Sequence, residues 1–435
     1  MTFRYYDAII TLQDILQINS VESAALTGYP FGKGVGKCLE YCLDLFTRLG
    51  FKTKNVDGYC GWAEIGEGEL FGILVHLDVV PEGEGWIYPP FGAVIDKNRI
   101  YARGAIDDKG PFVACLYAVM QLIQKGYKPK KRLRFILGCD EESGWECIKR
   151  YMQTEEIPAS GFAPDADFPV INCEKGVVYH TISFELPKGI DDIYGGDRAN
   201  IVPNSAYCKV KSSDEIEQRA REMNVAYRKE NDKLLLCAKG ISAHGSRPEQ
   251  GENALYKLFY CLGGKYQQFE KLYHVFAKDP EGAELNLKDE KSGKLTHNLG
   301  TCQIKNKKIV CELDIRFPIS YNKDDITKIL KKALDFEIQR GMFHDPLYLE
   351  EDHPLVQTLL QAYDEVMGNK IPSKPIAIGG GTYARALPVG VAFGPVLPNQ
   401  HAPLHEKDEY ISLEHFDLLT KIYYKAIKEI CFYDG

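Results

Sequence analysis

Residues 70–80 read "LFGILVHLDVV", a nearly unbroken run of apolar and β-branched residues. Such a run is typical of a strand that is covered on both faces, as in a parallel sheet. Residues 132–140, "RLRFILGCD", have the same character. Between the two lie residues 111–126, "PFVACLYAVMQLIQKG", which have the length of a helix, with proline at the start and glycine at the end. Strand, helix and strand in this order predict a right-handed crossover in a largely parallel sheet, and hence an α/β domain.

The chain is long enough for more than one domain, and its texture changes near residue 176. A chain of 435 residues exceeds the size at which one hydrophobic core stops growing. Beyond residue 176, short alternating strands are interleaved with charged helical stretches, a pattern typical of an α+β domain. We predict an α/β domain formed by residues 1–179 and 351–435, interrupted by an inserted α+β domain of residues 180–350.

The composition excludes several classes of function. A net charge of -8 argues against an electrostatic surface for nucleic acid. The N-terminal segment carries Arg4, Asp7 and Asp14 where a signal peptide needs an apolar core, and no uncharged apolar run reaches the ~18 residues of a membrane span. Thirteen cysteines are scattered without a Cys-x-x-Cys pair, which suits a reducing compartment. We expect a cytoplasmic protein with neither nucleic-acid nor membrane partners.

Polar side chains gather where the two predicted strands end. His76 and Asp78 are two residues apart at the end of the first strand, so the period of a strand places both on one face. Asp140, Glu141 and Glu142 follow the second strand. Because chemistry in parallel sheets gathers beyond the carboxyl ends of the strands, we expect all five side chains at one edge of the sheet.

An ordinary solvated loop explains the three adjacent carboxylates poorly. Their mutual repulsion at the end of a buried strand raises their pKa values unless cations neutralise the charge. A pair of cations would remove the conflict, and one glutamate could then bind metal while the other activates the attacking water as a general base. For Asp140 the pattern indicates no role beyond shaping the turn.

Further candidates are two acidic pairs and one histidine pair, each beside a predicted element: Asp107 and Asp108, Asp165 and Asp167, and His401 and His405. The first pair precedes the predicted helix, where capping of the helix N-terminus is the alternative explanation. A histidine alone is more often a surface residue than a ligand. Together, imidazoles and carboxylates without thiolates describe a site for Zn²⁺, or for Mn²⁺ or Co²⁺ if the site is rich in oxygen.

Eight ordered blocks, spread over nearly the whole chain, carry a family resemblance. They are "HLDVVPEG", "RGAIDDKGP", "DEESG", "PDADFP", "GISAHGSRPEQGENA", "DIRFP", "GGGTYARA" and "LHEKDEYI". In this order they resemble the dinuclear zinc metallopeptidase family of bacterial dipeptidases, carnosinases, aminoacylases and desuccinylases. Within that family, "RGAIDDKGP", "GGGTYARA" and the long inserted domain are most similar to the PepV-type bacterial dipeptidases.

The resemblance implies a zinc-peptidase fold with an inserted lid domain, and two divalent ions per subunit, zinc or else manganese or cobalt. The residues that match the family's metal ligands are His76, Asp107, Glu142, Asp165 and His405. Asp107 matches the carboxylate that bridges both ions, and its peptide bond to Asp108 is expected to be cis, as in relatives. Asp78 matches the aspartate that orients His76, and Glu141 matches the general base.

The resemblance also assigns residues that would bind the substrate, a small peptide. His244 matches the histidine that stabilises the tetrahedral oxyanion, although the alternative is a simple turn residue, and Asn200 resembles an asparagine that assists it. Arg316 and the backbone amides of Gly380 and Gly381 resemble the grip on the terminal carboxylate, for which a bidentate guanidinium and consecutive N–H groups are suitable chemistry. Because the inserted domain is longer than the family's simple dimerising version, the resemblance implies a functional monomer.

These matches imply a dipeptidase that acts on short L-peptides with free amino and carboxyl termini. Glu141 would take a proton from a metal-bridging water and pass it to the leaving amine. Two alternatives stay open: a deacylase that uses the same ions on N-acyl amino acids, and a catalytically silent protein that keeps the fold. The presence of Glu141 favours an enzyme, because a silent relative can lose the base and keep its ligands.

Overall fold

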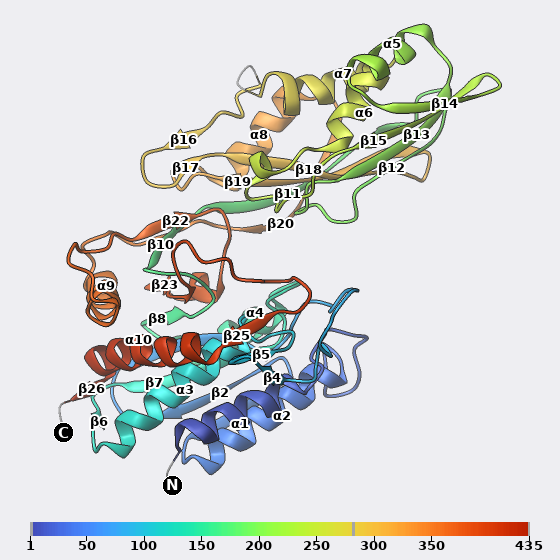
Figure 1. The fold of residues 1–435 in the computed structure, drawn as a ribbon. Coiled ribbons are helices and arrows are strands. Elements are labelled where there is room, and N and C mark those ends of the chain that lie inside the picture. Colours follow the sequence, from blue (N-terminus) through green and yellow to red (C-terminus); the bar gives the residue numbers. More distant parts are fainter. Residues whose placement is uncertain (1–2, 281–282, 434–435) are drawn as a thin grey trace. The chain divides into compact units, whose positions relative to one another are not determined.

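A computed structural model describes residues 3–280 and 283–433 of the chain. The chain forms two compact units (Figure 1). The first unit comprises Met1–Asn172, Leu349–Ile376 and Thr382–Gly435, and the second comprises Cys173–Tyr348 and Ala377–Gly381. The glycine-rich Ala377–Gly381 therefore belongs to the second unit, although it falls within the predicted second catalytic segment.

The central sheet of the first unit is parallel in its middle and antiparallel at its margins. Its strands follow the order β1 (Lys52–Val56), β2 (Cys60–Ile65), β7 (Arg132–Gly138), β3 (Leu70–His76), β8 (Ser160–Ala163), β23 (Gly390–Ala392) and β10 (Ile171–Glu174). β7, β3, β8 and β23 are parallel, whereas β1, β2 and β10 pair antiparallel. The predicted α/β fold with a largely parallel sheet is confirmed, and both predicted strands lie in its parallel part.

Six helices belong to the first unit among the described residues. They are α1 (Tyr5–Leu16), α2 (Lys33–Arg48), α3 (Lys109–Gln124), α4 (Glu146–Thr154), α9 (Pro354–Met367) and α10 (Leu413–Cys431). α3 follows β3 and precedes β7 in the chain, as predicted, and it packs against α1 and α10. It is buried on almost all sides, which explains why its sequence is apolar all round. None of the described helices is long and apolar enough to cross a membrane.

The strand predicted over residues 70–80 ends at His76. Just beyond it, the backbone N–H of Leu77 still donates to Gly138 O of β7 (2.9 Å), but that of Val79 donates to Ser20 O (3.2 Å), so the chain has left the sheet by Val79. Leu77 and Val79 remain buried in the loop. The prediction was four residues too long because apolar residues report burial, and a buried loop has the same composition as a buried strand.

Three short sheets bring distant segments of the first unit together. β5 (Arg99–Tyr101) pairs with β4 (Val94–Asp96) and β25 (Tyr410–Ser412), β9 (Ala166–Asp167) pairs with β24 (Pro395–Val396), and β6 (Lys128–Pro129) pairs with β26 (Phe432–Tyr433). A 3-10 helix, η3, covers Tyr383–Ala386. The β5–β25 pair is the one that matters for the site, because it joins the segment before Asp107 to the segment after His405.

The second unit is built on an antiparallel sheet. Its strands follow the order β14 (Ala226–Glu230), β15 (Lys233–Lys239), β13 (Ser205–Lys211), β12 (Ile190–Gly195), β18 (Thr296–Lys305), β19 (Lys308–Phe317), β11 (Gly176–Glu185) and β20 (Glu337–His344). Its helices are α5 (Asp214–Glu222), α6 (Ala254–Gly263), α7 (Gln267–Tyr273) and α8 (Lys323–Ala333). Shorter elements are η1 (Pro248–Gln250), the π-helical η2 (His274–Lys278), β16 (Lys288–Asp289), β17 (Gly293–Lys294), β21 (Leu347–Tyr348) and β22 (Ile376–Ile378). The predicted α+β class of the insert is confirmed.

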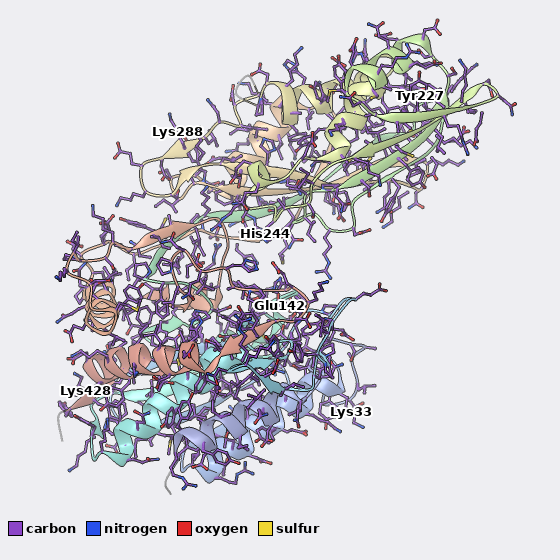
Figure 2. The ribbon with its side chains drawn as sticks, viewed as in Figure 1. Lys33, Glu142, Tyr227, His244, Lys288 and Lys428 are labelled. Atoms are coloured by element: carbon purple, nitrogen blue, oxygen red, sulfur yellow. The ribbon has the colours of Figure 1, made fainter. Side chains whose placement is uncertain are left out.

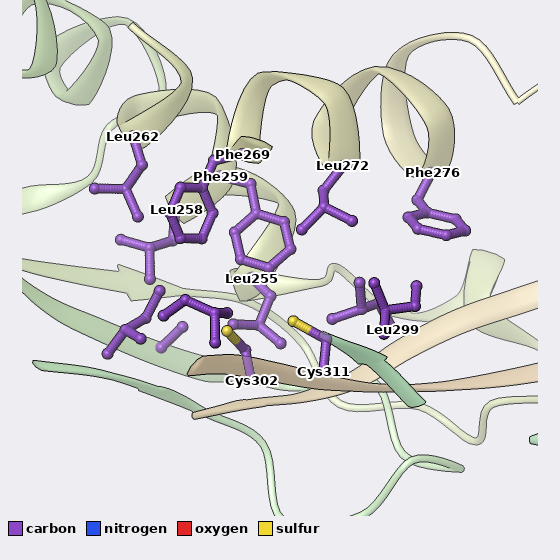
Figure 3. Packing of buried hydrophobic residues seen from close by; sticks show 14 of the residues in the cluster. Leu255, Leu258, Phe259, Leu262, Phe269, Leu272, Phe276, Leu299, Cys302 and Cys311 are labelled. Atoms are coloured by element: carbon purple, nitrogen blue, oxygen red, sulfur yellow. The ribbon is translucent and has the colours of Figure 1, made fainter. Parts of the chain in front are cut away.

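The core of the second unit lies between its sheet and two of its helices (Figure 3). Leu255 and Phe259 of α6 and Phe269 of α7 are fully buried there, above Cys302 of β18 and Cys311 of β19. These two cysteines are cross-strand partners, and both are buried free thiols. They act as small apolar side chains, which is the ordinary role of a buried cysteine.

Candidate metal centre

Predicted ligands follow the ends of three neighbouring parallel strands in the first unit. His76 is the last residue of β3, Glu142 follows β7 in the chain, and Asp165 follows β8. β7, β3 and β8 are adjacent in the sheet and parallel. The carboxyl ends of these strands therefore bring the three side chains to one edge, where binding sites in parallel sheets are found. Glu142 is labelled in Figure 2.

Asp107 lies between two imidazoles. Its Oδ1 is 2.9 Å from His76 Nε2, and its Oδ2 is 3.0 Å from His405 Nε2. The two oxygens of one carboxylate thus face two different histidines, as a carboxylate that bridges two ions would do. The peptide bond from Asp107 to Asp108 is cis, as expected.

The remaining predicted ligands complete two overlapping groups. Glu142 Oε1 is 3.0 Å from His405 Nε2, and Asp165 Oδ1 is 3.8 Å from His76 Nε2. Within the described residues, ligand atoms of His76, Asp107 and Glu142 all lie within 4.8 Å of one another, and so do those of His76, Glu141 and Asp165. The structure therefore brings together all five predicted ligands, together with Glu141.

The charges of this cluster favour divalent cations. Burial, with Asp165 adding to it, raises the pKa of Glu141 well above its ordinary value. Burial also raises the pKa of Asp165 to about 6, despite the opposing effect of His76. For His405, burial alone would lower the pKa, but the carboxylates of Asp107 and Glu142 raise it to about 11. Divalent ions would displace the protons that Glu141, Asp165 and His405 retain in this cluster, and nitrogen and oxygen donors suit zinc.

Asp78 supports the cluster from behind, and it does so through two different groups. Its backbone carbonyl, rather than its carboxylate, is the near partner of His76 Nδ1, at 2.9 Å against 3.7 Å for Oδ1. An Nδ1–H donated to this carbonyl leaves Nε2 as the ligand atom. Asp78 Oδ2 accepts from the backbone N–H of Glu142 (3.0 Å). Asp78 therefore holds both His76 and the loop that carries Glu142, two of the predicted ligands.

Capping does not explain Asp108. It is the residue before α3, but its side chain makes no capping hydrogen bond. Instead, the fully buried Oδ2 accepts from the backbone N–H of His76 (3.2 Å). The capping alternative is therefore wrong for this residue, which ties α3 to the end of β3.

Asp140 builds the turn that carries the two glutamates. Its Oδ1 accepts from Gly144 N and its Oδ2 accepts from Glu146 N, both at 2.8 Å. Burial raises its pKa to about 6, although these two N–H groups act in the opposite direction. The indole N–H of Trp145 closes the turn by donating to Glu141 O (2.8 Å). These hydrogen bonds show how Asp140 shapes the turn, which is the role predicted for it.

Two of the weaker candidates lie outside both ligand groups. His401 is exposed, and its Nε2 lies 3.4 Å from Glu406 Oε2. Asp167 belongs to β9, where its backbone carbonyl accepts from Gly394 N (3.4 Å). Sequence reasoning also missed Arg103, which lies in the block "RGAIDDKGP", and Glu409, which lies in "LHEKDEYI". The two residues form a buried ion pair, but they are far apart in the chain, so the sequence does not show it.

The predicted substrate residues cluster within the second unit. Gly245 N, next to His244, donates to Asn200 O (2.7 Å), and His244 Nδ1 lies 2.7 Å from Ser246 Oγ. His244 is labelled in Figure 2. A Cβ added to Gly245 would lie 2.8 Å from Asp314 Oδ2, so the cluster is closely packed.

Arg316 is buried in the same cluster. Its Nη1 donates to the carbonyl of Gly379 (3.3 Å), the residue before Gly380 and Gly381. However, Asp314 already binds the guanidinium in bidentate fashion, through Nε and Nη2, both at 2.8 Å. Sequence reasoning missed Asp314, although the i, i+2 spacing of "DIR" on one strand places both side chains on the same face.

Comparison with known sequences gives full-length matches. The sequence profile described as "Peptidase family M20/M25/M40" matches residues 72–429. A Bacillus subtilis protein named "Putative dipeptidase YtjP" is 40% identical over 455 residues, covering 98% of this chain and 97% of the relative. A Staphylococcus saprophyticus protein named "Putative dipeptidase SSP1012" is 35% identical over 460 residues, covering 98% of each chain.

Solved structures show the same fold at low sequence identity. A metallo-carboxypeptidase, Sso-CP2 from Sulfolobus solfataricus, is similar with a TM-score of 0.60 and 19% identity, over 97% of this chain and 98% of that one. Human carnosine dipeptidase 1 is similar with a TM-score of 0.58 and 14% identity, over 98% of this chain and 96% of that one. At these identities the similarity establishes the fold.

Proposed function

The chain belongs to peptidase family M20/M25/M40, and on that premise we propose that it is a dinuclear metal-dependent dipeptidase acting on short L-peptides with free termini. The proposal rests above all on the position of Asp107. Its Oδ1 lies 2.9 Å from His76 Nε2, and its Oδ2 lies 3.0 Å from His405 Nε2. The names of the sequence relatives support the substrate class.

The proposed ligands divide between the two ions. His76 and Asp165 would hold one ion, Glu142 and His405 would hold the other, and Asp107 would bridge them. When bound, two such ions polarise the scissile carbonyl and lower the pKa of a bridging water. Zinc is the ion that we propose, because the donors are imidazole nitrogens and carboxylate oxygens without thiolates; manganese and cobalt are the alternatives.

Glu141 is proposed as the general base that takes the proton of the attacking water and delivers it to the leaving amine. Its position supports this role, because it lies with His76 and Asp165 while its neighbour Glu142 contacts His405. Burial raises its pKa, and a base is most effective when its pKa lies near the working pH. Asp78, behind His76, is proposed to orient that ligand.

The second unit is proposed to supply the contacts to the substrate. His244, assisted by Asn200, would donate to the oxyanion that forms on the scissile carbonyl. Arg316 and the amides of Gly380 and Gly381 would hold the terminal carboxylate. The clustering of these segments inside one unit supports the assignment.

The test is removal and replacement of the metal. After treatment with a chelator, the protein is supplied separately with Zn²⁺, Mn²⁺ or Co²⁺ and assayed on a panel of L-dipeptides beside N-acetyl amino acids. We expect cleavage of dipeptides to be lost with the metal and restored by it. Restored cleavage of N-acetyl amino acids alone would establish the deacylase instead. Ions that bind without restoring any cleavage would indicate a silent protein.

We further propose that the enzyme works as a monomer in the cytoplasm. The length of the inserted segment supports the monomer, and thirteen cysteines without a Cys-x-x-Cys pair support a reducing compartment. Gel filtration with light scattering tests the first point; an obligate dimer whose activity is lost on dilution would overturn it. Fractionation of the cells that make the protein tests the second.

A further inference from the structure

A buried ion pair lies next to the metal centre in the first unit. Arg103 Nη1 donates to Glu409 Oε2 at 2.8 Å, and both side chains are almost completely buried. Neither residue is among the proposed ligands or catalytic groups. Placing two charges in the interior is costly, and such pairs often contribute little to stability compared with apolar side chains of similar volume. The position of the Arg103–Glu409 pair therefore calls for an explanation other than its contribution to stability.

The guanidinium of Arg103 binds backbone carbonyls from two loops beside the centre. Nη2 donates to Pro81 O (3.4 Å), Glu82 O (3.2 Å) and His405 O (3.4 Å), and Nη1 also donates to Glu406 O (3.2 Å). The first loop follows His76, and the second contains the ligand His405 itself. A planar fork with donors on three nitrogens can hold two loops in a fixed relation, whereas a lysine offers its donors from one freely rotating nitrogen.

The carboxylate of Glu409 holds a third ligand segment. Its Oε1 accepts from the backbone N–H groups of Ile106 (3.0 Å) and Asp107 (3.4 Å). Through the ion pair, the backbone of the bridging residue Asp107 is therefore connected to the backbone of His405. Because Asp107 Oδ2 and His405 Nε2 are only 3.0 Å apart, a small shift of either backbone changes the arrangement of two ligands at once.

His405 has particular need of such support. Its φ of 59° lies in the left-handed region, which L residues with a side chain adopt at a cost of roughly 1–2 kcal/mol. A backbone in this region persists when its surroundings determine it, and here the carbonyl of His405 is bound by Arg103. The ion pair is thus placed to keep His405 in the conformation that presents its imidazole.

We propose that Arg103 and Glu409 are positioning residues that set Asp107 and His405 in place for metal binding. The proposal rests on the proposed function, in which these two side chains are ligands. Without the ion pair of Arg103 and Glu409, the loop with His405 and the segment with Asp107 would no longer be held in one arrangement. The ion shared by Asp107, Glu142 and His405 would then bind more weakly, although every ligand is still present.

The chain offers a matched control in the same unit. Arg134 and Glu64 form a second buried pair, with Arg134 Nε 2.8 Å from Glu64 Oε2. The guanidinium also donates through Nη2 to Glu64 Oε2 (2.5 Å) and through Nη1 to Tyr151 Oη (2.8 Å) and Glu156 O (3.1 Å), and it lies 4.3 Å from the centre of the Trp62 ring; none of these partners belongs to a ligand segment. Its disruption should therefore affect stability without affecting the metal centre.

The experiment compares Arg103→Lys and Glu409→Gln with Arg134→Lys in the full chain. Lysine keeps the charge and loses the fork, whereas glutamine keeps an oxygen for Asp107 and loses the charge that faces Arg103. Zn²⁺ affinity of the chelator-stripped proteins is measured by titration calorimetry, and Co²⁺ absorption spectra report the ligand geometry. We expect one of the two ions to bind about 10–100-fold more weakly in the first two variants, as is typical when groups that orient metal ligands are altered. Their turnover should recover in excess metal.

Urea unfolding of the metal-free proteins separates positioning from stability. We expect Arg134→Lys to be destabilised and yet to bind both ions with wild-type affinity. Wild-type affinity and an unchanged Co²⁺ spectrum in both Arg103→Lys and Glu409→Gln would overturn the proposal. If Glu409→Gln does not fold, Arg103→Lys decides alone. A wild-type protein that binds no divalent ion would instead refute the proposed function, so the two failures are distinguishable.

Discussion

Replacement of Glu141 by glutamine tests the division of labour between two adjacent glutamates. The variant keeps the size of the side chain and removes its ability to accept a proton. The carboxylate of Glu141 lies with His76 and Asp165, whereas Glu142 Oε1 lies 3.0 Å from His405 Nε2. If Glu141 is the base and Glu142 the ligand, Glu141→Gln should bind both ions and turn over slowly.

The size of the effect follows from the surroundings of Glu141. A general base typically contributes about 10²–10⁴-fold to the rate, or about 3–5 kcal/mol of activation free energy. The carboxylates that act most strongly on Glu141, those of Asp165 and Glu142, are assigned to the ions in the proposal and cannot take over the proton. We therefore expect the whole contribution to be lost, with kcat falling at least about 100-fold.

The assay combines metal content with steady-state kinetics. Bound metal is measured by elemental analysis after gel filtration, and kcat is measured on a dipeptide in excess metal. Glu142→Gln is the matched control, since it makes the same chemical change one residue away. We expect it to lose affinity for one ion by at least about tenfold and to regain turnover when metal is added.

The opposite pattern would refute the assignment. Because Glu141 can also share a ligand group with His76 and Asp165, its removal has a clear alternative outcome. Loss of an ion from Glu141→Gln, with both ions retained and turnover lost in Glu142→Gln, would show that the two roles are exchanged. Full turnover in Glu141→Gln would show that it is neither base nor essential ligand.

Three further predictions concern stability. Burial, with Arg340 and Lys331 adding to it, lowers the pKa of His180 from 6.5 to about 4. Between pH 7 and pH 5 the unfolded chain therefore takes up a proton at this residue that the folded chain does not. This uptake lowers the free energy of unfolding by about 2 kcal/mol at pH 5 relative to pH 7. His180→Gln should remove this difference in urea unfolding at the two pH values. A Cβ on Gly138 would lie 2.3 Å from Tyr383 Cε2, so Gly138→Ala should destabilise the protein by about 1–3 kcal/mol in the same assay, and Tyr383→Leu in addition should recover part of that loss. Free Zn²⁺ at 100 times its Kd should stabilise the protein by about 2.7 kcal/mol, and a chelator should abolish this gain in thermal unfolding.

The parallel core was predictable because its composition follows directly from its burial. Strands covered on both faces must be apolar throughout, and β3 and β7 are buried along nearly their whole length. The residue types of the proposed ligands were predictable for a related reason: carboxylates at the end of a buried strand conflict with its apolar surroundings unless something neutralises them. The sequence shows that charged carboxylates follow an apolar strand, whereas only the structure shows which groups lie close enough to compensate their charge.

Contacts between distant segments were not predictable from one sequence. Ala377–Gly381 joins the second unit through pairings such as Lys175 N to Ile378 O (3.0 Å), and no local signal marks such a contact. Arg103 and Glu409 lie 306 residues apart in the chain. Each is an ordinary charged residue in the sequence, and only the fold shows that both are buried and that they bind the backbone of Asp107 and His405.

The bidentate grip proposed for Arg316 is limited by the donors that remain to it. A guanidinium has five N–H donors. Asp314 accepts from Nε and Nη2, Tyr179 Oη accepts from Nη2 (3.4 Å), and Gly379 O accepts from Nη1. One N–H on Nη1 is left, so a fork of two bonds to the substrate carboxylate would displace Gly379 or Tyr179. A carboxylate held here would therefore rely on one guanidinium N–H together with other donors, which is a reason for the glycine amides to share the task. Asp314 therefore fixes the direction of the Arg316 guanidinium and leaves the charge of the guanidinium only partly available to a ligand.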